Sequence, residues 1–232
     1  MNERLQTEYG QVTGGAGLST DRQRVLRNTY WLLALSMVPT VLGAWVGVST
    51  GILASMGFGM STIVFLVGAF GLMFLVEKTK NSSMGVAALL GFTFFMGLML
   101  SRLLAQILGF SNGSSLIMMA FGGTGAIFFG MATLATVIKR DLSGMGKFLF
   151  VGAIILLVVG LVNIFLQSTA LMLTIMALSM AVFSAFMLYD IKRVIDGGET
   201  NYISATLAIY LDVYNVFQSL LSLLGIFGGE RD

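Results

Sequence analysis

Seven long apolar runs occupy most of this 232-residue chain. Each is close to the roughly 20 residues that an α-helix needs to cross about 30 Å of hydrocarbon. None alternates apolar and polar residues as the strands of a membrane β-barrel do. Helices and closed barrels are the only structures that span a bilayer, so the runs predict seven transmembrane helices. The runs are Thr29–Val48, Ser55–Val76, Met84–Leu108, Ser115–Ile138, Lys147–Leu166, Thr169–Asp190 and Ile203–Phe227.

The composition agrees with lipid as the solvent of this chain. Hydrophobic residues make up 56% of it and charged residues 10%, whereas a soluble domain carries about 25% charged residues. We therefore expect an all-α polytopic membrane protein. Residues 1–27 are polar, glycine-rich and without the apolar stretch of a signal peptide. They predict a flexible cytoplasmic N-terminal tail, followed by a seven-helix transmembrane domain over residues 28–228.

The chain contains no cysteine and no histidine. Disulfides, thiolate metal sites and histidine-based zinc or haem sites are therefore excluded, and we expect no resident cofactor. Because imidazole is the usual proton sensor near neutral pH, any such sensing in this chain must use carboxyl groups.

Lysine and arginine are distributed unequally between the two sides of the predicted membrane. Eleven of the thirteen lie in the tail or in the connections on one side of the membrane, and positive charge marks the cytoplasmic side. The N-terminus is therefore predicted inside and the C-terminus, after seven crossings, outside. The basic residues are dispersed and predict membrane topology, not a nucleic-acid partner. The eleven are Arg4, Arg22, Arg24, Arg27, Lys78, Lys80, Lys139, Arg140, Lys147, Lys192 and Arg193.

Two acids stand out in the last two runs. Asp212 lies near the middle of the last run, where a charged side chain costs about 2.5–3.5 kcal/mol on insertion scales, and this cost indicates a function. Asp190 closes the preceding run, and the two carboxyls can meet if that helix continues beyond it. Two such groups cannot both ionise cheaply, so they would share a proton and form a pH switch. The alternative is that Asp190 faces water or pairs with Lys192 or Arg193.

The last run carries polar residues along two faces of its predicted helix. Such faces predict a central helix surrounded by the other six. Asn215 and Tyr210 are the candidate supporting groups for the acid pair. The alternative is that these side chains only hold the bundle together, at about 0.6 kcal/mol per hydrogen bond. One face contains Ser204, Ala208, Asp212, Asn215, Ser219 and Ser222, and the other Thr206, Tyr210, Tyr214 and Gln218.

Three further residues are weaker candidates. Arg102 lies inside the third run and either extends to the headgroups or lines an outer vestibule. Glu77 and Lys78 close the second run, where they form a solvated boundary or bind an aspartate of the pair. Gly43 and Gly47 of the first run are spaced for close helix packing.

Several segments of the chain resemble the Bax inhibitor family, and specifically its bacterial YccA-type branch. The resemblance covers nearly everything from about Val25, and its last segment is the most specific. The segments are VLRNTYWLLAL at 25–35, FGLMFLVEKTK at 70–80, MAFGGTGAIFF at 119–129, NIFLQSTAL at 163–171 and GGETNYISATLAIYLDVYNVFQSLLSLLGIFG at 197–228.

The resemblance implies a fold with six helices around a central seventh, in the bacterial inner membrane, with the C-terminus in the periplasm. It also implies a pH-sensitive calcium leak in which two aspartates form the gate. Asp190 in LYDIKR and Asp212 in YLDVYN match those positions, and calcium would be the permeant ion in transient contact with both. In leak members an arginine of the second helix pairs with the acids. This chain has none there, only Glu77 and Lys78 at the end of that run.

The YccA-type branch implies a second role, as substrate and modulator of a membrane-anchored AAA protease that pulls on the N-terminal tail. The sequence therefore predicts a cation leak gated by the aspartate pair, or alternatively a non-transporting modulator of membrane protein quality control. An intramembrane hydrolase would need an activated water between the acids and access for a substrate. Nothing in the sequence indicates such access, and we expect no enzymatic activity.

Overall fold

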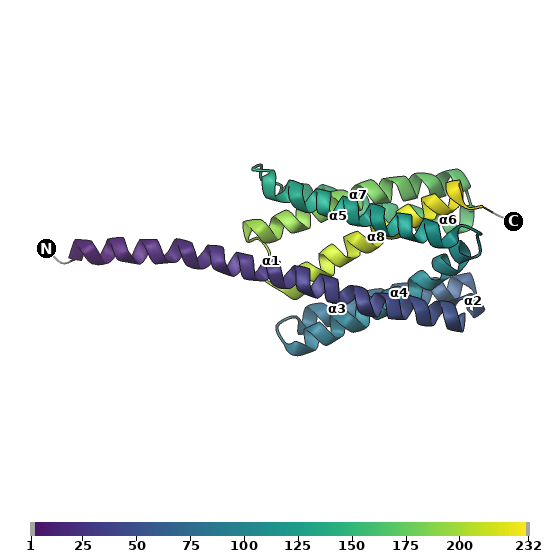
Figure 1. The fold of residues 1–232 in the computed structure, drawn as a ribbon, viewed down its shortest axis with the longest axis horizontal. Coiled ribbons are helices and arrows are strands. Elements are labelled where there is room, and N and C mark those ends of the chain that lie inside the picture. Colours follow the sequence, from purple (N-terminus) through teal and green to yellow (C-terminus); the bar gives the residue numbers. More distant parts are fainter. Residues whose placement is uncertain (1–2, 231–232) are drawn as a thin grey trace.

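The computed structural model describes residues 3–230, and their side chains from residue 20 onward except at position 58. This range folds into eight helices and contains no strand (Figure 1), which confirms the all-α class. The helices are α1 Glu3–Thr50, α2 Ile52–Ser55, α3 Phe58–Thr79, α4 Ser83–Leu108, α5 Gly113–Val137, α6 Met145–Leu166, α7 Thr169–Asp196 and α8 Tyr202–Gly228.

Seven of the described helices are long and apolar enough to cross a membrane, as predicted, and the protein is a polytopic membrane protein. The eighth is the four-residue helix α2. The predicted second run began at Ser55, whereas α3 begins at Phe58. Gly51, at φ 62°, interrupts the helical backbone before α2, because glycine adopts such a turn without steric cost.

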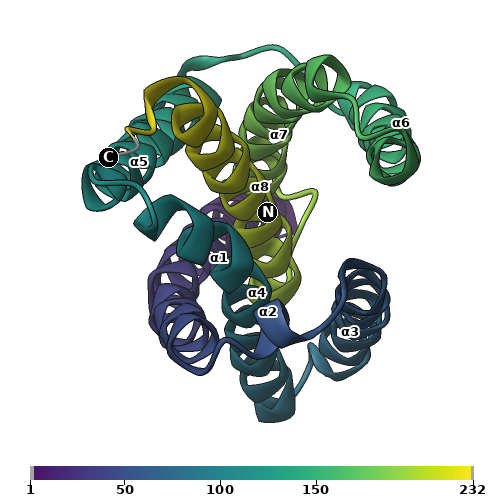
Figure 2. The same cartoon turned by 90° about the vertical axis from the view of Figure 1, so that its right-hand side faces the viewer.

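The C-terminal helix α8 occupies the centre of the bundle, as predicted, but the predicted ring of six helices is incomplete because α6 packs against α7. Figure 2 shows α8 with α1, α4, α5 and α7 around it, while α3 lies beside α4 and α6 lies at the periphery against α7. Buried residues follow α8 from Ile203 to Gly225. The helix α6 has none, and its apolar surface on all sides suits a helix in contact with lipid.

The turns on either side of α7 bring the last three helices together. Gln167, at φ 49°, ends α6, and the hydroxyl of Ser168 caps α7 by accepting a hydrogen bond from the Leu171 amide. The result is a tight α6–α7 hairpin. At its other end α7 continues past Asp190 to Asp196 and is followed by Gly197, whose φ of 83° suits glycine.

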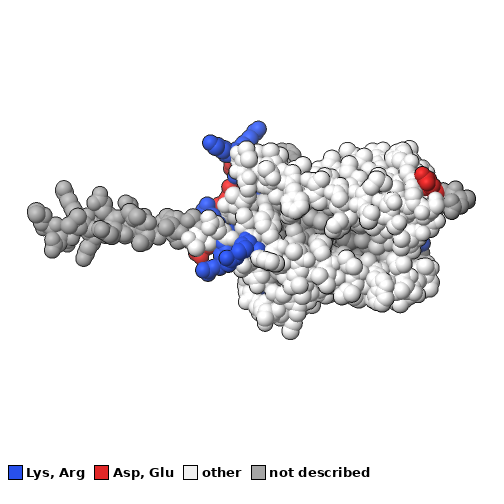
Figure 3. Space-filling model, viewed as in Figure 1, with Lys and Arg blue, Asp and Glu red and all other residues white. Residues whose placement is uncertain are grey.

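Charged side chains gather at the end of the bundle where α7 ends and α8 begins (Figure 3). Most of the side chains there are lysines and arginines, in agreement with the unequal distribution predicted from the sequence. The candidate membrane span within α1 includes the predicted first run, Thr29–Val48. The predicted flexible tail, residues 1–27, falls mostly outside the described side chains and stays a prediction, as does the domain boundary at residue 28.

Candidate functional site

The two acids singled out in the sequence lie against each other in the structure. Asp190 extends from α7 and Asp212 from α8, and their carboxyl groups are within hydrogen-bonding reach. Asp212 is buried, with 4% of its surface exposed. Since an ionised carboxylate can only accept hydrogen bonds, a bond between the two needs a proton on one of them.

Two buried oxygen atoms on the same face of α8 have no hydrogen-bond partner among the described residues. They are Oδ2 of Asp212 and Oγ of Ser204. Buried polar groups are nearly always hydrogen-bonded in folded proteins. A pair of unsatisfied atoms two helical turns apart therefore points to water or an ion at this face.

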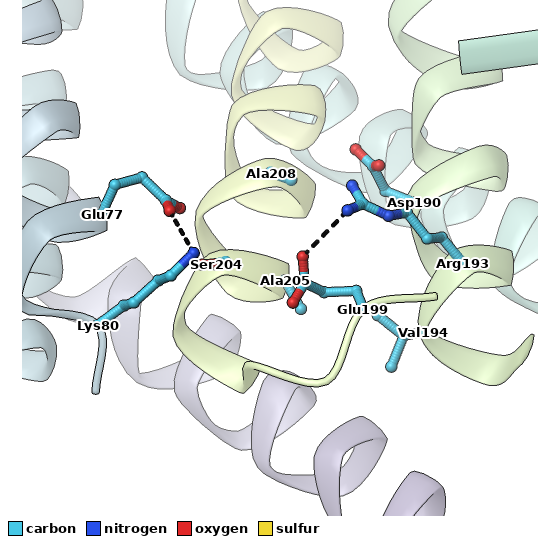
Figure 4. A pocket seen from close by; sticks show the side chains of 9 residues that line it. All are labelled: Glu77, Lys80, Asp190, Arg193, Val194, Glu199, Ser204, Ala205 and Ala208. Carbon is cyan, nitrogen blue, oxygen red and sulfur yellow. Dashed lines mark hydrogen bonds and ion pairs between the residues drawn. The ribbon is translucent and has the colours of Figure 1, made fainter. Parts of the chain in front are cut away.

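A cavity of about 280 Å³ lies next to this face, between the ends of α3 and α7 and the start of α8. Figure 4 shows charged side chains from both sides of α8 around it. Sequence reasoning identified two of its lining residues as site residues, Asp190 and Glu77, and missed Lys80 and Glu199 in that role. The lining residues are Glu77, Lys80, Asp190, Arg193, Val194, Glu199, Ser204, Ala205 and Ala208.

Two ion pairs border the cavity (Figure 4). Lys80 Nζ lies 2.7 Å from Glu77 Oε2, and Arg193 Nη2 lies 3.4 Å from Glu199 Oε2. The hydrogen bond and the charge of Glu77 raise the pKa of Lys80 above its ordinary value. The cations of the cavity thus face glutamates, and Asp190 forms no ion pair with any described residue.

The alternative partners considered for Asp190 pair elsewhere. Lys192 Nζ lies 2.8 Å from Asp196 Oδ1, one turn further along α7, and Arg193 is paired with Glu199. Asp190 turns toward Asp212 because α7 continues as a helix beyond it, so that it faces α8 inside the bundle and not the surface.

The two candidate supporting residues on α8 differ in their contacts. The Tyr210 hydroxyl lies 2.8 Å from Thr40 Oγ1 of α1 and 3.4 Å from the Thr93 carbonyl oxygen of α4. Tyr210 therefore links α8 to two neighbouring helices. Asn215 donates instead to the Leu211 carbonyl oxygen of its own helix, at 2.8 Å.

Arg102 and Lys78 lie away from the acid pair. Arg102 donates to Ser61 Oγ at 3.2 Å, between α4 and the beginning of α3, which is the opposite end of the bundle. Lys78 is exposed and does not line the cavity. Lys80 lines it because it lies three residues after Glu77, on the same helical face. That spacing was the signal in the sequence for Lys80.

The carboxyl pair does not by itself form a calcium site. Among the described side chains, no three or more acidic groups are close enough to hold a metal ion. Calcium takes six to eight oxygen ligands, so two carboxyls would need water to complete its shell. Transient contact of calcium with Asp190 and Asp212 stays a prediction.

Comparison with known proteins gives consistent matches over the whole membrane domain. The sequence model of the family described as "Inhibitor of apoptosis-promoting Bax1" matches residues 22–229. The chain is 42% identical over 214 residues to an uncharacterized membrane protein of Vibrio cholerae, covering 90% of this chain and 92% of the relative.

Two Escherichia coli relatives carry functional or cellular descriptions. The chain is 40% identical over 202 residues to "Modulator of FtsH protease YccA" of strain K12, covering 87% of this chain and 90% of the relative. The identity and coverage are the same for "Inner membrane protein YccA" of Escherichia coli O6:H1.

Proposed function

The chain belongs to the Bax inhibitor family, and from that premise we propose that it is a cation leak of the bacterial inner membrane gated by protonation of the Asp190–Asp212 pair. The contact between the two carboxyls supports this proposal more than any other observation. With one proton shared, the pair holds α7 and α8 together. Loss of that proton places two negative charges side by side.

The repulsion is comparable in size to the free energy that a gate needs. Two unit charges about 4 Å apart repel by about 4 kcal/mol at an effective dielectric constant of about 20. Moving a two-state equilibrium from 1:99 to 99:1 takes about 5.5 kcal/mol. Deprotonation of the pair therefore supplies most of the energy that a complete opening needs.

The direction of the response follows from the charges. Ionised carboxylates open the charged end of the bundle and attract Ca²⁺, a hard cation that prefers oxygen ligands. Protonation closes it. The excess of lysine and arginine at this end supports a cytoplasmic gate, with the N-terminus in the cytoplasm and the C-terminus in the periplasm.

The test is calcium flux into liposomes that contain the purified protein, measured as a function of pH. The wild type should conduct more as pH rises. The Asp190→Asn, Asp212→Asn double variant should lose this dependence, because amides do not titrate. Asp196→Asn is the matched control, since Asp196 lies on α7 near its end, pairs with Lys192 and does not line the cavity. Flux that responds to pH equally in all three proteins would refute the gate.

We also propose, as a second candidate, a non-enzymatic modulator of a membrane-anchored AAA protease. The supporting observation is the similarity to the Escherichia coli K12 relative, a modulator of the FtsH protease, of which 90% of the length is aligned. Deleting residues 1–25 separates the two candidates. A modulator should lose its effect on degradation by the protease, whereas a leak should keep its flux. If the truncated protein kept both its effect on the protease and its flux, the modulator would be refuted.

A further inference from the structure

We propose that the cavity beside Asp190 is a water-filled vestibule, open only at the lysine- and arginine-rich end of the bundle, with its water anchored by Ser204. The carboxyl pair then exchanges protons with that side of the membrane alone. This inference deepens the proposed gate by naming the side whose pH it would follow, but the vestibule itself can be tested without any flux.

The hydroxyl of Ser204 is the first reason to place water there. Ser204 lines the cavity, only 8% of its surface is exposed, and its Oγ has no partner among the described residues. A buried polar group left unpaired costs about 1–3 kcal/mol. Water is the simplest partner, because the cavity's 280 Å³ has room for several molecules at about 30 Å³ each.

The polar groups around Ser204 meet the second requirement for ordered water, which needs two to four polar partners. Asp190 and Glu77 contribute carboxyl oxygens to the same cavity. Ala208 lies one turn beyond Ser204 on the same face of α8, so the cavity lining extends along that face in the direction of Asp212.

Charged groups surround the mouth of the cavity. They come from the end of α3, from α7 and from the turn before α8, whereas α8 itself lines the cavity with uncharged residues. The helices α1, α4 and α5 contribute no described residue to the lining. The side chain of Arg193 is 45% exposed and that of Glu77 44%, so water reaches the mouth. The charged and titratable groups are Glu77 and Lys80 at the end of α3, Asp190 and Arg193 on α7, and Glu199 in the turn before α8.

The opposite direction along α8 is closed by packing. Val216 and Leu221 are completely buried, and the hydroxyl of Tyr214 donates to the Met96 carbonyl oxygen at 3.2 Å. These residues lie between Asp212 and the C-terminal end of the bundle. The described side chains therefore leave the acid pair accessible to water from the charged end only.

The absence of cysteine from the chain makes this accessibility directly measurable. Ser204→Cys introduces a single thiol, which is exposed to a membrane-impermeant cationic methanethiosulfonate reagent in inside-out and in right-side-out membrane vesicles. Ser143→Cys, in the exposed turn between α5 and α6 at the same end, is the positive control. Ser219→Cys, on the same face of α8 but buried beyond Asp212, is the negative control.

The vestibule predicts labelling of Ser204→Cys and Ser143→Cys in inside-out vesicles, complete loss of both in right-side-out vesicles, and no labelling of Ser219→Cys in either. Ala208→Cys, also in the cavity lining, serves in place of Ser204→Cys if that variant does not fold. Failure of the folded cavity variant to react in inside-out vesicles, or its reaction from the other side, would overturn the vestibule.

Labelling and flux separate this inference from the proposed function. Labelling as predicted without calcium flux at any pH supports the vestibule and refutes the leak. A pH-dependent flux without labelling refutes the vestibule and leaves the leak standing.

Discussion

Adding one methyl group at Gly97 of α4 should force α1 and α4 apart. A Cβ built there overlaps the Thr40 carbonyl oxygen, and it would lie 2.8 Å from the Thr40 carbonyl carbon and 3.0 Å from the Ala44 nitrogen. Carbon atoms pack best at about 3.5–4.0 Å. Because the obstacle is backbone, no side-chain rotation relieves it, and the helices must separate by roughly 1 Å or more.

The expected cost of Gly97→Ala is about 1–3 kcal/mol, the range for overpacking a close-packed site. For a chain of this length each kcal/mol lowers the melting temperature by about 2–4 °C. The assay is a heating series of the detergent-solubilised protein, in which the remaining monodisperse fraction is measured by size-exclusion chromatography.

Gly91→Ala is the matched control, because Gly91 lies on the same helix and a Cβ there meets nothing within 4 Å. Alanine is the better helix former by about 1 kcal/mol, so this variant should melt no lower than the wild type. If Gly97→Ala were as stable as Gly91→Ala, the close approach of α1 and α4 would be refuted.

Three further predictions concern single polar contacts. Tyr210→Phe removes the hydroxyl bonded to Thr40 and should cost about 0.6–1.7 kcal/mol; an unchanged melting temperature would contradict that bond. Asn201→Ala removes the cap of α8 and should cost about 1 kcal/mol, seen as faster amide exchange in its first turn; unaltered exchange would argue against the cap. Hydrogen bonds from the amide and hydroxyl of Ser143 lower the pKa of Asp141. These bonds therefore stabilise the turn at pH values above the ordinary carboxyl pKa, and the stabilisation is lost as pH falls through the lowered pKa of Asp141. Ser143→Ala, which keeps the amide, should raise that pKa partway in an NMR titration; no rise would rule out the hydroxyl's part.

The spans and the central helix were predictable because both depend on composition along the chain. A membrane-spanning helix needs about 20 predominantly apolar residues wherever it lies in the bundle, and a helix with polar faces needs protein around it. The close packing at Gly43 was also indicated by its spacing from Gly47. The partner was not, because only the fold places Gly43 against the backbone of Phe94.

The surroundings of the acid pair were less predictable. The apolar run ends at Asp190, but α7 continues to Asp196, and Lys192 remains in the helix with 8% of its surface exposed while it pairs with Asp196. Hydropathy does not register such a segment at the membrane interface. The choice between Lys78 and Lys80 depends on which helical face turns toward α8, and residues two positions apart on a helix point in nearly opposite directions.

The central claim is that the proton shared by Asp190 and Asp212 controls the bundle, and single-residue neutralisation tests it most directly. Asp212→Asn leaves one titratable carboxyl, so a repelling pair of charges cannot form at any pH. The measurement is calcium flux through liposomes containing this variant, at an acidic and at an alkaline pH. The account predicts a low flux that is the same at both. A flux that still rises with pH as in the wild type would contradict it.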